Sequence, residues 1–147
     1  MPSSTTDPRR FVGRWRLDRT MLDLATGDRG CAHGDLMIDR RPDGTLSWIE
    51  SATMTWGLRQ APVSRSLTLA ESEAGWCFRF ADGRDFHPWQ LGRPFEHWCH
   101  PDLYRGVLSE PGPDRLHLRW DVHGPAKHHR YRTRLRRARP QAGAPGR

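Results

Sequence analysis

Short segments in which apolar and polar residues alternate with a period of two run through most of this chain. The longest segment covers residues 45–56, where Leu46 and Trp48 share one face. Turn signals such as Pro-Asp-Gly at 42–44 and Asp-Gly at 82–83 separate the segments. About nine or ten short strands at this spacing are typical of a sandwich or barrel, and a closed barrel removes exposed strand edges. The pattern therefore predicts an all-β fold with a single antiparallel β-barrel.

The chain of 147 residues has the length of one domain. Residues 9–137 carry the alternating pattern and form the predicted barrel domain. Residues 1–8 are polar and residues 138–147 are rich in Pro, Gly and Ala, so both ends are expected to be disordered. No run is long and apolar enough for a membrane span or a secretory signal, and the cysteines do not form a disulfide framework. A cytoplasmic location is therefore expected, without a membrane partner.

The net charge of +7 is concentrated near the C-terminal end of the chain. In the last predicted strand, arginines occupy every second position from Arg130 to Arg136, on the face opposite Tyr131 and Leu135. This row could bind a nucleic acid or another anionic partner, or it could be the solvated outer face of an edge strand. Nucleic-acid binding usually adds a groove or stacking aromatic rings. The solvated face is therefore favoured, and nucleic acid is not the expected partner.

Two charged residues fall on otherwise apolar strand faces. Glu50 lies among Trp48 and Ala52, and Arg65 shares a face with Leu67. A buried charge needs a partner, because desolvation alone costs several kcal/mol. The two residues could form a pair that orients a ligand inside the barrel, with Glu50 as a candidate acid–base residue. A purely structural ion pair, or a bulge that turns either residue outward, is the alternative.

Imidazole, carboxylate and phenol groups gather between residues 83 and 104. Here His87, His97, Asp102 and Tyr104 are candidate catalytic residues, because histidine titrates near neutral pH and a carboxylate can hold one tautomer. The competing interpretation is that these side chains cap turns and satisfy buried backbone groups.

The same stretch contains a possible metal-binding pattern at His97, Cys99 and His100. Zinc needs about four ligands from separated pairs, and only alternate residues of a strand share a face, so His100 would point away from the others. No metal or other cofactor is therefore predicted, although a haem or metal site remains an alternative. Cys99 lacks a nucleophile signature and is expected to be a buried thiol.

Gly13-Arg14-Trp15 resembles the Gly-x-Trp signature of the lipocalin-like (calycin) barrels. The resemblance implies that Trp15 closes the barrel floor and that a basic residue of the last strand, Arg134 or Arg136, packs over it. A second resemblance, over residues 11–137, is to the family catalogued as domain of unknown function 6314. It rests on FVGRWRLDR at 11–19, ADGRDFH at 81–87, HWCHPDLYRG at 97–106 and RWDVHGPAK at 119–127. This family implies a lipocalin-like barrel and no established activity.

The sequence thus predicts a barrel that binds a hydrophobic or aromatic small molecule. It leaves open whether the protein is a carrier or an enzyme with cofactor-free acid–base chemistry, as in a cyclase, an isomerase or a dehydrating lyase. A monomer or homodimer is expected. The residues expected to contact the ligand are Trp48, Trp56, Arg65, Phe78, Trp120 and Cys99. Whether the barrel is hollow is not determined by the alternation pattern.

Overall fold

The computed structural model describes residues 6–139, and it confirms the predicted all-β fold. One antiparallel sheet of ten strands curls into a nearly closed lipocalin-like barrel, with the strand order β6-β5-β4-β3-β2-β1-β10-β9-β8-β7. The strands are β1 (Gly13–Asp23), β2 (Arg29–Arg40), β3 (Leu46–Trp56), β4 (Arg59–Ser72), β5 (Gly75–Phe80), β6 (Asp85–Pro88), β7 (Pro94–Cys99), β8 (Asp102–Gly112), β9 (Arg115–His123) and β10 (His128–Arg137). No helix within residues 6–139 is long and apolar enough to cross a membrane.

A single 3-10 turn, η1 (Pro8–Phe11), precedes the first strand. Asp7 accepts a hydrogen bond from the Arg9 N–H at its start, and Thr6 accepts one from the indole of Trp89. Phe11 is the last residue of this turn, and β1 begins at Gly13. Most of the segments expected to be disordered, 1–5 and 140–147, lie outside the described residues.

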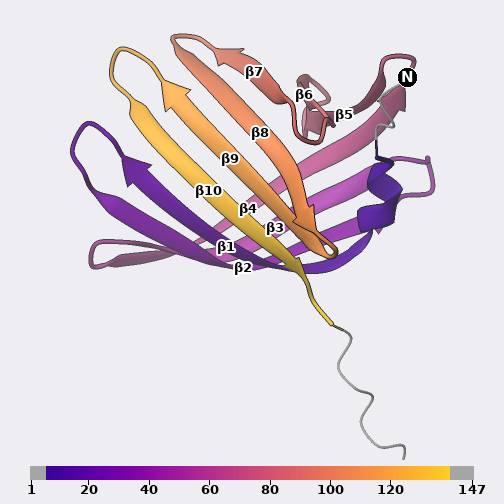
Figure 1. The fold of residues 1–147 in the computed structure, drawn as a ribbon, viewed down its shortest axis with the longest axis horizontal. Coiled ribbons are helices and arrows are strands. Elements are labelled where there is room, and N and C mark those ends of the chain that lie inside the picture. The colour runs from indigo at the N-terminus through magenta and orange to yellow at the C-terminus, as the bar shows by residue number, and fades with distance from the viewer. Residues whose placement is uncertain (1–5, 140–147) are drawn as a thin grey trace, which may run out of the picture.

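The two ends of the barrel differ. Figure 1 shows η1 and the end of β10 at one end, and the β7–β8 and β9–β10 turns at the opposite end. We call the first end the floor. We call the second end the mouth; it consists of the turns at 24–28, 57–58, 81–84, 100–101 and 124–127.

Trp15 closes the floor. It is 0% exposed, and its indole donates a hydrogen bond to the carbonyl of Phe11. The basic residue over its ring is Arg137, whose guanidinium carbon lies 4.6 Å from the ring centroid. The prediction of Arg134 or Arg136 is wrong, because these residues have the outward parity of β10, whereas Arg137 shares the inward parity of Leu135 and pairs in register with Trp15.

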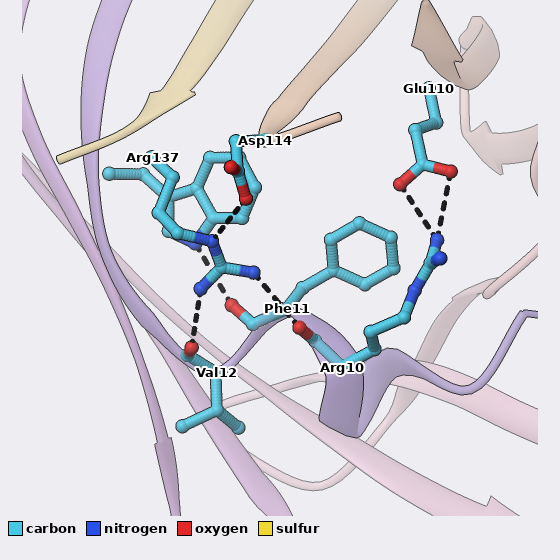
Figure 2. Close-up of polar contacts among 7 residues, drawn as sticks. Arg10, Phe11, Val12, Glu110, Asp114 and Arg137 are labelled. Atoms are coloured by element: carbon cyan, nitrogen blue, oxygen red, sulfur yellow. Dashed lines mark hydrogen bonds and ion pairs between the residues drawn. The ribbon is translucent and has the colours of Figure 1, made fainter. Parts of the chain in front are cut away.

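Arg137 also ties the floor together. Its guanidinium donates to the carbonyls of Val12 and Arg10, at 2.7 and 2.9 Å, and its Nε donates to Asp114 in the β8–β9 turn at 2.8 Å (Figure 2). One side chain thereby links β10, the approach to β1 and the turn between β8 and β9. The floor is therefore sealed by an arginine of β10 whose donors have partners in both of the other two segments.

Within residues 6–139 no backbone ladder joins β6 and β7, the two ends of the sheet order, and only the isolated bridge between Leu91 and Leu108 lies near this gap. Aromatic rings pack across this gap instead. The ring of His87 stacks on Phe95 at 4.1 Å, and Phe86 meets the ring of His97 at 5.1 Å. We call this contact between β6 and β7 the seam. The histidine-rich stretch at 83–104 builds the seam, so its aromatic density serves closure of the barrel.

The lower interior is filled by large side chains. Trp48 meets Phe78 edge-on at 5.1 Å, and Trp120 stacks on Phe86 at 5.4 Å with the ring planes nearly parallel. Gly106 makes this packing possible, because a Cβ there would lie 2.4 Å from the Phe95 ring. The remaining void, about 10 Å³, has room for about one water molecule at most.

Candidate functional site

A pocket of about 360 Å³ lies toward the mouth, above the filled layer. Its lining is Arg19, Glu50, Ala52, Val63, Ser64 and Arg65. Glu50 and Arg65 also border the small void below, so they mark the boundary between the packed floor half and the open mouth half. We call this space the mouth pocket. Its volume falls in the range of ordinary small-molecule sites, about 300–1,000 Å³.

Glu50 is held rigidly at the bottom of the mouth pocket. It is 4% exposed, and one of its oxygens accepts a hydrogen bond from Arg19 at 2.7 Å. The other oxygen accepts from the indole N–H of Trp48 at 2.9 Å. Arg19 in turn donates through Nε to the hydroxyl of Thr133 at 2.7 Å. Both carboxylate oxygens therefore have close donors, as a buried charge requires.

Arg65 faces Glu50 in register across β3 and β4, yet the ion pair of Glu50 is with Arg19. The Arg65 guanidinium instead lies over the ring of Phe86, 5.0 Å from its centroid. Burial lowers the pKa of Arg65, while the nearby charge of Glu50 opposes that shift and the charge of Arg19 adds to it. The expected Glu50–Arg65 ion pair is thus replaced by Glu50–Arg19, with Arg65 resting on an aromatic ring.

Arg19 was missed as a site residue. It continues the inward positions of Trp15 and Leu17 on β1, so the alternation pattern alone could have identified it. It reaches Glu50 from two strands away, across β2. The inward position on β2 between Ala32 and Leu36 is Gly34, where a Cβ would collide with Ala52 of β3.

His87 lies in the packed layer at the seam and borders the void beneath the mouth pocket. Its Nδ1 lies 3.0 Å from the carbonyl of Pro88, so Nδ1 carries the proton and Nε2 has the free lone pair. The pKa of His87 is lowered to about 4, chiefly by burial, with the charge of Arg65 adding to the lowering and the hydrogen bond to the Pro88 carbonyl opposing it. At neutral pH the imidazole is therefore uncharged.

The other candidate acid–base residues line the mouth on β7 and β8. His97 and Tyr104 are register partners, and both are half-buried. Asp102 is buried at 9% exposure, and its carboxylate lies 3.5 Å from Nζ of Lys127. Tyr104 and Asp102 raise the pKa of Lys127. The mouth therefore carries phenol, carboxylate, ammonium and imidazole groups on one side.

A second polar group stands on β1 and β10. The Nδ1 of His129 lies 2.9 Å from the hydroxyl of Tyr131, and its Nε2 lies 3.5 Å from the carboxylate of Asp23. Burial raises the pKa of Tyr131. These residues were not among the predicted site residues.

The predicted ligand-contacting residues separate into two groups. Trp48, Phe78 and Trp120 belong to the filled layer, and Trp56 lies half-buried near the mouth over Gly30. Cys99 is exposed beside the β7–β8 turn, so the expectation of a buried thiol is wrong. The reason is its place at the end of an edge strand, where no neighbouring strand covers it.

Within residues 6–139, no three His, Cys, Asp or Glu side chains gather closely enough to hold a metal ion. The metal alternative built on His97, Cys99 and His100 thus has no ligand cluster in this part of the chain.

Two solved structures share the fold. One is the S-type phycobiliprotein lyase from Guillardia theta, with a TM-score of 0.63 and 14% identity over 90% of this chain and 91% of that one. The other is a protein of unknown function from the DUF3598 family of Nostoc punctiforme, with a TM-score of 0.53 and 13% identity. That match covers 90% of this chain and 49% of the other. At such identities the similarity concerns the fold alone.

No curated protein matches this sequence significantly. A family model described as a family of unknown function, DUF6314, matches residues 11–137, which include the floor, the seam and the mouth pocket. The chain therefore belongs to the DUF6314 family, as its sequence motifs predicted.

Proposed function

We propose that this protein binds a small hydrophobic or aromatic molecule in the mouth pocket. The observation that carries this proposal is the pocket of about 360 Å³, which lies above a sealed floor and is bordered by the buried Glu50 and the half-buried Arg19 and Arg65. Apolar side chains such as Ala52 and Val63 form part of its wall, and Glu50 and Arg65 supply polar anchors. An apolar wall with a few fixed polar groups is the usual composition of a ligand site.

The shared fold is consistent with this proposal. A barrel of the same fold occurs in a protein named as a phycobiliprotein lyase. In the present chain the filled floor half excludes a deeply inserted ligand, because its void has only about 10 Å³. The bound molecule therefore sits in the mouth half, with one part open to solvent.

The apolar dye N-phenyl-1-naphthylamine tests the proposal, because its emission rises on entering an apolar site. Titration into the parent protein should give saturable binding. Val63→Trp fills the pocket and should weaken dye binding by about 10-fold or more, since the added indole occupies the site. Ser66→Trp, on the exposed outer face of β4, is the matched control. Equal binding by all three proteins would contradict the proposal.

Acid–base chemistry on the bound molecule, such as cyclisation, isomerisation or dehydration, is a second candidate function. Glu50 borders the pocket, and His97 and Tyr104 stand opposite each other near the mouth. Since Arg19 and Trp48 occupy both oxygens of Glu50, binding has the stronger support. Proton transfer would appear as exchange of the α-protons of α-tetralone in D2O, followed by NMR. Exchange that persists unchanged in both Glu50→Gln and His97→Ala would exclude this chemistry.

The outer face of β10 favours a further alternative, an anionic partner. Arg132, Arg134 and Arg136 are exposed there, and Arg136 stands in register between Arg16 and Arg115. None of these arginines has a carboxylate within 4.0 Å among residues 6–139. Like charges directly opposite each other destabilise a sheet, and an anion bound between them would relieve this repulsion.

Fluorescence anisotropy with a labelled oligonucleotide tests this alternative. If phosphates bind the arginine row, the affinity for the oligonucleotide should fall steeply as the salt concentration rises. The double variant Arg132→Gln/Arg134→Gln should show a weaker dependence of this affinity on salt. If the oligonucleotide does not bind even at low salt, the anionic-partner alternative fails and the outer face of β10 is a solvated surface.

A further inference from the structure

The mouth pocket contains more positive than negative charge. Two guanidinium groups, Arg19 and Arg65, line it together with one carboxylate, Glu50. The carboxylate is fully engaged by Arg19 and by the indole of Trp48. Arg65 therefore has no carboxylate within 4.0 Å among residues 6–139, although it lies in register with Glu50.

A comparison with the other half-buried arginines shows that this is unusual in the molecule. Arg19, Arg79, Arg130 and Arg137 are also half-buried, and each lies within 3.2 Å of a carboxylate oxygen. Among residues 6–139, Arg65 has neither an ion pair within 4.0 Å nor a side-chain hydrogen bond. Within residues 6–139 each half-buried arginine therefore has a carboxylate partner except Arg65, one of the two arginines that line the pocket.

The position of Arg65 suits an incoming anion. Phe86 supports one side of its guanidinium group, which fixes the orientation of a long side chain before any ligand arrives. The planar guanidinium presents paired N–H donors that match the geometry of a carboxylate or a sulfonate. The partial burial that removes water from Arg65 also strengthens its attraction for an opposite charge.

We propose that the ligand of the mouth pocket is a small aromatic or hydrophobic monoanion, whose carboxylate or comparable oxyanion binds Arg65. This inference rests on the proposed function and specifies its ligand class. A single negative charge would neutralise the pocket, since one of its two guanidinium groups is already paired. The apolar part of the ligand would lie along Ala52 and Val63 toward the mouth.

Two dyes with the same aromatic skeleton separate the anionic from the apolar contribution. They are 1-anilinonaphthalene-8-sulfonate, which is an anion, and N-phenyl-1-naphthylamine, which lacks the sulfonate. The parent protein should bind the anionic dye at least about 10-fold more tightly, because hydrogen bonds to charged groups are the stronger class. Arg65→Met should remove this preference and leave binding of the neutral dye within about twofold. Arg105→Met, on the exposed outer face of β8, is the control and should change neither affinity.

The outcomes distinguish this inference from the proposed function. If the parent binds neither dye, the proposed function fails. If it binds both dyes equally and Arg65→Met changes nothing, the pocket stands and the anion assignment is overturned.

A competition experiment on the parent protein covers the case in which Arg65→Met does not fold. With N-phenyl-1-naphthylamine bound, 1-naphthoate should displace it at a concentration about 10-fold lower than 1-naphthalenemethanol does. Equal displacement by the acid and the alcohol would overturn the inference without any variant. Circular dichroism melts of each variant show which experiment applies.

Discussion

The imidazole of His87 lies among the rings of Phe78, Phe86 and Phe95, with centroid distances between 4.1 and 4.6 Å. In this environment the charged form loses its hydration, and only the Pro88 carbonyl remains as a partner for Nδ1. His87, predicted as a catalytic residue, is in this structure a neutral ring packed among other aromatic rings. Because these surroundings disfavour the protonated imidazole, protonation of His87 lowers the free energy of unfolding.

We predict that His87 makes folding pH-dependent below neutrality. Its pKa is about 4 in the folded protein and about 6.5 when unfolded. Between these values the unfolded chain binds the proton and the folded chain does not, so the free energy of unfolding rises with pH, by up to roughly 3 kcal/mol. This contribution is complete above about pH 6.5 and is lost as the pH falls through the folded pKa. Urea melts give the unfolding free energy at pH 5 and at pH 7. The difference between these two free energies should be larger for the parent than for His87→Gln, and equal differences would contradict the prediction.

Arg137 provides a second test at the residue scale. Arg137→Met removes the contact over Trp15, two hydrogen bonds to backbone carbonyls and the pair with Asp114. We expect a loss of about 1–3 kcal/mol in unfolding free energy, because Asp114 is exposed and only the buried contacts contribute strongly. Arg136→Met, one residue earlier on the outer face, should cost less than about 0.5 kcal/mol. Similar losses for the two variants in denaturant melts would show that Arg137 does not seal the floor.

At the scale of elements, β6, β7 and β8 explain the unusual composition of residues 83–104. The seam needs rings on both sides because no backbone ladder joins β6 to β7. His87 and Phe86 supply one side, and Phe95 and His97 the other. Behind them, β8 carries Gly106, which lets the rings of Phe95 and Trp120 lie directly against the strand backbone.

Replacing Gly106 should therefore disturb the seam. In Gly106→Ala the new Cβ would lie 2.4 Å from the Phe95 ring and 2.9 Å from the Trp120 ring, so both rings must shift. We expect a loss of about 1–3 kcal/mol, the usual cost of overpacking. Gly112→Ala on the same strand meets no atom within 4 Å and is the matched control. Thermal melts that coincide for the two variants would argue against tight packing at the seam.

On the scale of the whole molecule, the barrel is a sealed, aromatic-filled half joined to an open, polar half. Glu50 and Arg65 stand at the boundary between the two. The long strands β1 to β4 are each paired on both sides, whereas β6 and β7 are paired on one side only. The barrel is therefore continuous everywhere except along the seam.

Hydrogen exchange should follow this asymmetry. Backbone amides of β6 and β7 should exchange earlier than those of β2 and β3, because edge strands lack a second ladder and open at a lower free energy. Peptide-resolved exchange with mass spectrometry on the unliganded protein measures the order. Protection of β6 and β7 equal to that of β2 and β3 would mean that the seam is closed as firmly as the rest of the barrel.

The inward position of each candidate site residue was largely predictable, while its partner was not. The alternation of β3 and β4 predicts that Glu50 and Arg65 point inward. The alternation of β1, continued from Trp15 and Leu17, predicts the same for Arg19. The alternation of each strand does not show that Glu50 forms its ion pair with Arg19 and not with Arg65. That choice depends on the stagger of the strands around the barrel.

What the sequence alone determined is the all-β architecture, its turns and the inward faces, because the side-chain period of a strand is a local property. The place of Trp15 in the floor followed from the resemblance of Gly13-Arg14-Trp15 to the calycin signature. What only the tertiary structure decided is that Arg137 covers Trp15, that the floor half is filled, and that a pocket of about 360 Å³ remains at the mouth. These features depend on contacts and summed volumes of side chains that lie far apart in the chain. Packing of that kind is set by the closed barrel as a whole.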